Sequence, residues 1–267
     1  SCMANAGLAP GDVEQLTVVS CTGYATPGLD ILLARDLGLP SGTQRLHIGH
    51  MGCYAALPGL ATAADAAAAR DRTTVLLCLE LTSLHIQPPV HDREQMVAHA
   101  LFSDAAAAVA VSPGSRGPGN RGGLEVVDFV ARTDVARVAL MSWDVTDLGF
   151  RMGLSPQVPA VLSAHVADAV GELLSRHGVG LDAVAHWAIH PGGPRVVDVV
   201  AERMGLSDTQ VAASRDVLRE HGNCSSATVL LILDRIVAGG DLQPGEHVVA
   251  MAFGPGLTLY ATLLRAC

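Results

Sequence analysis

The stretch HMGCYAAL, residues 50–57, separates a short apolar run at 45–48 from an alanine-rich segment at 55–69. The run predicts a strand and the segment a buried helix, and Gly52 allows the sharp turn between them. Cys53 would then stand at the first turn of a helix, where free N–H groups and the helix dipole favour an anion. The pattern therefore indicates a thiol of lowered pKa that can act as a nucleophile. The alternative is a small buried core residue.

The composition narrows the classes of function. Of the 267 residues, 49% are hydrophobic and only 3% aromatic, which indicates a large aliphatic core. The net charge is −9 and all 17 basic residues are arginine, which argues against nucleic acid or an anionic membrane surface as the main partner. The six cysteines include no CxxC pair, and we interpret them as free thiols in a reducing compartment. We find neither a membrane-spanning apolar run nor a signal peptide, so we expect a cytoplasmic protein without membrane contact.

Strands and helices alternate in the first half of the chain. We predict strands at 15–20, 45–48, 73–81 and 105–111, and helices at 28–37, 55–69 and 94–102. Residues 2–8 have the pattern of the last turn of a helix that ends at Gly7. The Gly/Pro-rich connector at 112–123 predicts a domain boundary, with one half at 1–118 and the other at 119–267.

The second half repeats the arrangement of the first. We predict strands at 124–133, 138–143, 185–190, 247–253 and 257–264, and helices at 158–173, 195–204 and 225–236. Gly52-Cys53 and Gly222-Asn223 each precede a buried helix and two apolar strands. A duplicated unit of this kind implies two helices side by side between two sheets, with their N-termini converging. Cys53 and Asn223 would then meet.

Four motifs carry a family resemblance: MGCYAA at 51–56, IHPGGP at 189–194, HGNCSSA at 221–227 and AFGPGLT at 252–258. With ALFSDAAAA at 100–108 and LGFRMGLSPQVP at 148–159, their order resembles the chalcone/stilbene synthase family, the type III polyketide synthases. The resemblance begins near residue 16 and lacks the family's N-terminal segment, which carries the basic residues that hold the CoA phosphates. It implies an α/β, thiolase-like fold with a duplicated α-β-α-β-α arrangement whose N-terminal half is incomplete.

The resemblance implies a catalytic triad of Cys53, His190 and Asn223. A starter acyl group would pass from an acyl-CoA to Cys53, be extended by decarboxylative Claisen condensation with malonyl-CoA, and cyclise to a pyrone, resorcinol or other aromatic polyketide. His190 is suited to hold the thiol as thiolate, and Asn223 can donate to the enolate oxygen without titrating. CoA thioesters are the substrates, and we expect no other cofactor and no metal.

The resemblance also assigns residues to the substrate cavity. Phe102 matches the gatekeeper between CoA tunnel and cavity, and Met152 takes the second gatekeeper slot in place of an aromatic residue. Further cavity slots fall at or near Cys21, Thr22, Thr82, His85, Trp143 and Ser225. Gly254, Pro255 and Gly256 fit a loop close to the reacting thioester, although an ordinary turn is an equally good interpretation. Met152 favours an aliphatic starter, whereas Trp143 indicates the reverse.

Two other functions remain open: a single-round condensing enzyme similar to ketoacyl synthase III, and a truncated homologue without activity. HPGG and FGPGLT argue against the first, and the intact triad argues against the second.

The family forms homodimers, and we expect one here. His47 and His50 are three residues apart in a predicted strand, which disfavours a metal site. We expect Glu80 to be a satisfied structural carboxylate.

Overall fold

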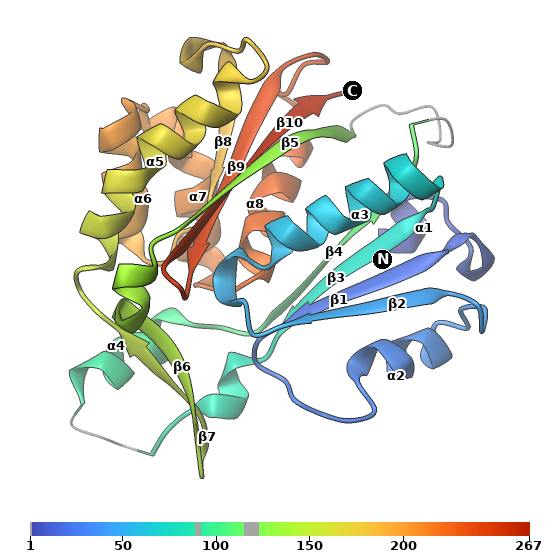
Figure 1. The fold of residues 1–267 in the computed structure, drawn as a ribbon, viewed down its shortest axis with the longest axis horizontal. Helices are drawn as coiled ribbons and strands as arrows, with labels where there is room; N and C mark the ends of the chain where they lie inside the picture. Colours follow the sequence, from blue (N-terminus) through green and yellow to red (C-terminus); the bar gives the residue numbers. More distant parts are fainter. Residues whose placement is uncertain (1, 89–91, 115–122) are drawn as a thin grey trace.

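The chain, described here from a computed structural model over residues 2–88, 92–114 and 123–267, folds around two four-stranded sheets (Figure 1). The boundary predicted at 118, within the connector at 112–123, lies outside these residues. The elements of the first half are α1 (Cys2–Asn5), β1 (Gln15–Ser20), α2 (Leu29–Asp36), β2 (Gln44–Gly49), α3 (Ala56–Arg70), β3 (Thr74–Glu80), α4 (Arg93–Leu101) and β4 (Ala105–Val111).

The second half is longer and contains a separate two-stranded hairpin. Its elements are β5 (Leu124–Thr133), β6 (Met141–Thr146), β7 (Gly149–Leu154), α5 (Val158–Ser175), β8 (Val184–Ile189), α6 (Pro194–Met204), α7 (Asp208–His221), α8 (Ala227–Ala238), β9 (His247–Gly254) and β10 (Thr258–Ala266).

The two sheets have related topologies. The first has the order β2-β1-β3-β4, in which β1 pairs parallel with β2 and β3 while β4 runs antiparallel. The second has the order β5-β10-β9-β8, in which β8 and β9 are parallel and β10 is antiparallel to its neighbours. In both sheets a strand with a parallel neighbour therefore also adjoins an antiparallel one, β4 in the first sheet and β10 in the second. The two halves thus repeat the order of a buried helix and two strands that the duplicated sequence pattern predicted.

Helices α3 and α8 form the middle layer between the sheets. Leu57 and Leu60 of α3 share one apolar cluster with Ile232 of α8, with Leu76 of β3 and with Ala250 of β9. The small side chains of α3 (ALPGLATAADAAAAR) allow close packing, and Gly59 in particular would bring a Cβ within 3.0 Å of Leu76. This close packing fixes the N-termini of α3 and α8 relative to each other.

Outer helices complete five layers, α-β-α-β-α. Alternate residues of β9 face opposite sides of the second sheet: Ala250 belongs to the inner cluster, whereas Met251 and Phe253 pack against α5 and α6. Leu162 and Val166 of α5 lie in the same outer cluster. By length and composition alone α5 could cross a membrane, which differs from the sequence expectation, but its apolar face belongs to this core.

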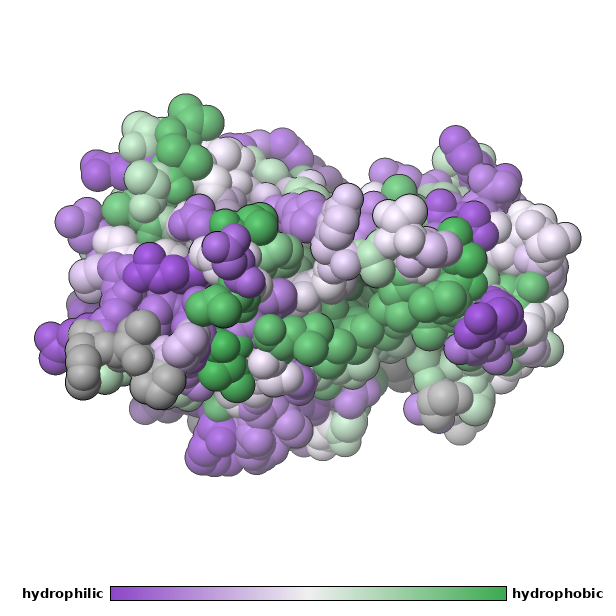
Figure 2. All heavy atoms as spheres, turned by 90° about the horizontal axis from the view of Figure 1, so that it is seen from below, coloured by the Kyte–Doolittle hydropathy of each residue, from purple (hydrophilic) through white to green (hydrophobic). Residues whose placement is uncertain are grey.

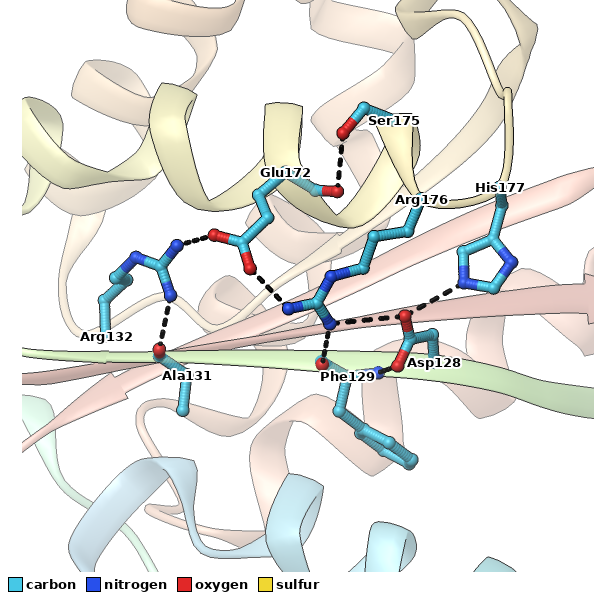
Figure 3. A network of polar contacts seen from close by, with 8 residues as sticks. All are labelled: Asp128, Phe129, Ala131, Arg132, Glu172, Ser175, Arg176 and His177. Atoms are coloured by element: carbon cyan, nitrogen blue, oxygen red, sulfur yellow. Dashed lines mark hydrogen bonds and ion pairs between the residues drawn. The ribbon is translucent and has the colours of Figure 1, made fainter.

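An ion-pair network joins the C-terminal end of α5 to β5 (Figure 3). Glu172 of α5 contacts both Arg132 of β5 and Arg176. Asp128 of β5 receives Arg176 Nη1 at 3.4 Å and His177 Nε2 at 2.9 Å. Because these groups are partly exposed, salt screens them and each pair contributes little stability by itself.

The structure differs from the sequence prediction at three elements, one with other bounds and two that were not predicted. The strand expected at 138–143 begins only at Met141, because residues 135–140 form a 3₁₀ segment that Asp134 caps through the N–H of Ala136. Strand β7 was not predicted, since GFRMGL mixes glycine and arginine with apolar residues. Helix α7 was also missed, although Ser207 and Gln210 form a capping box at its start.

Candidate active site

Cys53 lies in a 3₁₀ turn (Gly52–Tyr54) directly before α3, one turn earlier than the sequence predicted. Its side chain is buried, with 6% exposed. Gly52 has φ +78°, and a Cβ there would lie 2.5 Å from Cδ of Pro255. The absence of a side chain at Gly52 therefore lets the β9–β10 turn pack directly on the turn that carries the nucleophile.

This close approach predicts that Gly52→Ala lowers the free energy of unfolding by about 2 kcal/mol or more, because it adds a clash to left-handed strain. Gly38→Ala is the matched control: Gly38 has φ +65°, and a Cβ there meets nothing within 4 Å. We expect about 1 kcal/mol from strain alone at that position. Urea unfolding measures both, and equal losses would contradict the packing argument.

His190 follows the last residue of β8, at the carboxyl end of the sheet. Its backbone N–H donates to the carbonyl of Met251 at 2.8 Å, which fixes the residue beside β9. The imidazole is fully buried, and neither ring nitrogen has a hydrogen-bond partner in the structure. A buried polar group without a partner is unfavourable unless a ligand supplies one.

Asn223 stands just before α8 and its amide has a fixed orientation. The backbone N–H donates to Leu101 at 2.8 Å, and the backbone carbonyl accepts from Ser103 at 3.0 Å. The side-chain Oδ1 accepts the Ser225 N–H at 2.9 Å, so the NH₂ group points the other way. Asn223 and Ser225 both lower the pKa of the Cys53 thiol, which places their polar groups close to the sulfur.

One cavity of about 610 Å³ brings the three side chains together. Cys53, His190 and Asn223 all line it, with Phe102 and Met152 in the same wall. Sequence reasoning did not assign most of the remaining lining to the cavity: four of these residues lie in the motifs quoted above, but the motifs do not show which of their side chains face the cavity. The apolar part of the lining comes from Val97, Leu101, Met141, Leu154, Val158, Leu162 and Phe253, and the charged part from Arg93, Glu94 and Arg195.

The electrostatics differ from the sequence expectation of a thiolate beside an imidazolium. Burial raises the pKa of the Cys53 thiol to about 12, although hydrogen bonds from Ser225 and Asn223 act in the opposite direction. Burial likewise lowers the pKa of His190 to about 3. Both groups are therefore neutral at pH 7, because burial disfavours the charged form of each. His190 can then accept the proton of Cys53 rather than hold it away in advance.

The depressed pKa of His190 predicts a pH-dependent stability. The unfolded state binds a proton below pH 6.5 while the folded state does so only near pH 3, so stability falls as the pH decreases through that window. Within that window, His190 makes the free energy of unfolding change by about 1.4 kcal/mol per pH unit, and we expect His190→Gln to remove this dependence. Unfolding free energies at several pH values measure it. The exposed His47→Gln serves as control, and an equal slope in wild type and H190Q would contradict the assignment.

A second buried group lies behind the nucleophile. Glu80 is 0% exposed and accepts hydrogen bonds from Thr22 Oγ1 at 2.8 Å and Ser226 Oγ at 2.5 Å. Cys21 Sγ lies 3.5 Å from this carboxylate and 3.3 Å from Ser225 Oγ, which also contacts Cys53. Glu80 is thus a satisfied buried carboxylate, and burial followed by the charge of Glu80 raises the pKa of Cys21 well above its usual value.

The other residues assigned to the cavity from the sequence do not line it in the structure. Thr82 donates to Asp104 Oδ1 at 3.3 Å at an exposed site. Trp143 Nε1 donates to the Cys21 carbonyl at 2.8 Å, and its ring packs against His85. Cys21, Thr22 and Ser225 form the layer behind Cys53, and Gly254, Pro255 and Gly256 form the turn that packs on Gly52 and Tyr54.

Among the residues that the structure describes, no cluster of three or more His, Cys, Asp or Glu side chains could hold a metal ion. His47 and His50 lie at the exposed end of β2, outside the cavity. All six cysteines are free thiols.

Known proteins with similar sequences show to which family the chain belongs. The family description "Chalcone and stilbene synthases, C-terminal domain" matches residues 127–267, and the corresponding N-terminal domain matches residues 1–115. The chain is 36% identical to 3,5-dihydroxyphenylacetyl-CoA synthase of Streptomyces toyocaensis, over 99% of this chain and 69% of that protein. It is 33% identical to 1,3,6,8-tetrahydroxynaphthalene synthase of Streptomyces peucetius subsp. caesius, over 97% of this chain and 69% of the relative.

Solved structures agree with the sequence relatives. PKS-I from the brown alga Ectocarpus siliculosus superposes with a TM-score of 0.91 at 32% identity, over 99% of this chain and 72% of that one. 1,3,6,8-Tetrahydroxynaphthalene synthase from Streptomyces coelicolor A3(2), a bacterial type III polyketide synthase, superposes with a TM-score of 0.92 at 28% identity. The superposition covers 99% of this chain and 75% of that one. The chain therefore belongs to the chalcone and stilbene synthase family: it is an acyltransferase of the type III polyketide synthase class with the thiolase fold.

Proposed function

We propose that Cys53 accepts an acyl starter from CoA and that malonyl-CoA then extends it to a polyketide that cyclises to an aromatic or pyrone product. The observation that carries this proposal is the shared cavity, in which a thiol, an imidazole with two unpartnered nitrogens and an oriented carboxamide face one space. Together these groups can supply the nucleophile, the proton acceptor and the oxyanion donor of acyl transfer.

In the loading step, the sulfur of Cys53 attacks the thioester carbonyl of the starter. The neutral imidazole of His190 takes the thiol proton and returns it to the departing CoA thiolate, so that protons and charge balance. The side chain of Ser225, which favours the thiolate form of Cys53, stabilises the sulfur as negative charge develops.

In the extension step, malonyl-CoA loses CO₂ and its electron pair becomes an enolate. Because decarboxylation makes the carbanion, no base needs to remove a proton from carbon. The NH₂ group of Asn223 and one ring N–H of His190 donate to the enolate oxygen. The enolate carbon then attacks the thioester carbonyl on Cys53, a carbon–carbon bond forms, and the sulfur of Cys53 leaves.

The shape of the cavity favours an aliphatic starter. Its apolar lining includes Met141, Leu154, Val158 and Leu162, while Trp143 lies outside the lining. Apolar side chains of this kind stabilise a bound methylene chain by about 0.8 kcal/mol for each buried CH₂ group. Competition between butyryl-, lauroyl- and benzoyl-CoA for acylation of Cys53 would test whether aliphatic starters are preferred.

We also propose a cytoplasmic homodimer. Figure 2 shows apolar side chains in a band across one face of the molecule. The exposed large apolar residues of the protein include Leu84, Ile86, Val145 and Leu148. A contiguous apolar surface is typical of an interaction site. Light scattering gives the mass in solution, and a monomer at all concentrations would exclude the dimer.

Incubation with radiolabelled malonyl-CoA and a series of starters tests the reaction. We expect products that contain several malonyl-derived units. A product of one condensation would favour the ketoacyl synthase III alternative, and a folded protein without turnover would favour the non-catalytic homologue.

A further inference from the structure

The β6–β7 hairpin forms one wall of the cavity and belongs to neither large sheet. Met141 of β6 and Met152 and Leu154 of β7 line the cavity, and the register pairs Met141 with Leu154 and Trp143 with Met152. A two-stranded hairpin is marginally stable by itself. Its position, and with it the position of Met152, must therefore be fixed by what contacts the other edge of β7.

Side chains rather than a third strand satisfy that edge. Phe150 N–H donates to His85 Nδ1 at 3.0 Å, and the Phe150 carbonyl accepts from Gln87 Nε2 at 3.2 Å. The Met152 carbonyl accepts from Gln95 Nε2 of α4 at 2.6 Å. Residues 150 and 152 are two apart, so their backbone groups point to the same side of the strand. Three side chains thus take the place of a neighbouring strand.

The clamp formed by His85, Gln87 and Gln95 is itself anchored. His85 Nε2 donates to the Thr22 carbonyl at 2.6 Å, and its ring stacks on Phe150 with centroids 4.5 Å apart. The Gln87 N–H donates to His99 of α4 at 3.2 Å. Gln95 is only 2% exposed, so its amide cannot exchange this bond for one to bulk water.

We propose that Gln95 is a positioning residue for substrate choice: by holding the carbonyl of Met152 it fixes the cavity wall and so limits the length of the acyl chain that reaches Cys53. The proposal rests on the proposed function. Without the Gln95 bond, the backbone at the edge of β7 keeps its side-chain hydrogen bonds at Phe150, and the Arg151–Asp92 ion pair still joins the strand to the start of α4. Met152, a flexible side chain at the wall, then loses the bond that fixes its own backbone and can move outward. The cavity then accepts longer chains.

The test is acylation of Cys53 followed by mass spectrometry of the intact protein, with butyryl-CoA and lauroyl-CoA in competition. We expect Gln95→Met, which keeps the length but removes the donor, to raise the lauroyl-to-butyryl ratio by about tenfold, the range of a change of one or two methylene contacts. Gln15→Met is the matched control, because Gln15 also makes a buried amide hydrogen bond, to Thr17 at 3.3 Å in β1 away from the cavity. It should change stability and leave the ratio unchanged.

A double-mutant cycle shows whether Gln95 acts through Met152. Met152→Ala should raise the same lauroyl-to-butyryl ratio. In the variant that combines Gln95→Met with Met152→Ala, the increase in this ratio should be much smaller than the product of the two single increases. Independent effects that multiply would overturn the proposal. If Gln95→Met does not fold, Gln87→Met carries the test, since it loosens the same strand at Phe150.

Unchanged ratios in folded Q95M and Q87M would also overturn the proposal. The experiment separates a failure of the proposed function from a failure of the role of Gln95. Wild-type protein that takes no acyl group from any CoA thioester would refute the proposed function, whereas normal acylation with unchanged selectivity in the variants would refute only the role of Gln95.

Discussion

Replacing Cys53 with alanine is expected to abolish acyl loading, with a loss of about 10⁴-fold or more. The reason is that the thioester needs a sulfur at the point where His190 and Asn223 converge, and in the described part of the cavity lining no other thiol occupies that place. Intact-protein mass spectrometry after incubation with an acyl-CoA measures the loss directly.

Cys21 is the informative control for this variant. Its sulfur lies behind the nucleophile, 3.3 Å from the Ser225 hydroxyl that also contacts Cys53, and it does not line the cavity. Cys21→Ala should therefore keep the acyl group on Cys53. Loss of loading in C21A together with persistent acylation in C53A would mean that the two thiols have been assigned the wrong way round.

The second large effect is expected at Asn223. Asn223→Asp retains an oxygen that can accept the Ser225 N–H, so the turn before α8 keeps this bond, but it replaces the NH₂ donor with a carboxyl oxygen that cannot stabilise the oxyanion. We expect malonyl-CoA decarboxylation to fall by about 10²–10³-fold, the usual loss for one such donor. Release of labelled CO₂ measures it.

The rate of starter loading shows whether Asn223 acts in decarboxylation alone or whether its replacement disrupts the whole active site. Acylation of Cys53 in N223D should remain within a few-fold of the wild type, and Asn223→Ala should behave similarly with an additional loss of stability. An equal loss of loading and decarboxylation would show that Asn223 acts in both steps and that the division of roles is wrong.

The sequence predicted the parts of the fold that depend on apolar periodicity and on glycine. QLTVVS at β1, the apolar run of β3 and the buried helices α3 and α8 all appear within a residue or two of their expected bounds. The convergence of Cys53 and Asn223 followed from the duplicated pattern, because buried helices with equivalent starts must pack side by side. The family assignment followed from the motifs and is confirmed by both domain matches.

What the sequence could not provide depends on three-dimensional surroundings. The pKa values of Cys53 and His190 shift opposite to expectation because burial dominates them, and no motif encodes the extent of burial. The clamp on β7 was missed for a similar reason: Gln95 lies 57 residues before Met152, and neither residue type suggests the contact. Cavity lining from α4 and α5 likewise consists of ordinary helix residues.

The two unpartnered nitrogens of His190 have a consequence for the life of the protein in the cell. Since no group in the described residues pairs with these nitrogens, a substrate that pairs with them adds binding free energy to the folded form alone. Supply of thioester would then govern how long each molecule resists heat and proteolysis, so that a cell starved of starter would lose the catalyst as well as its output.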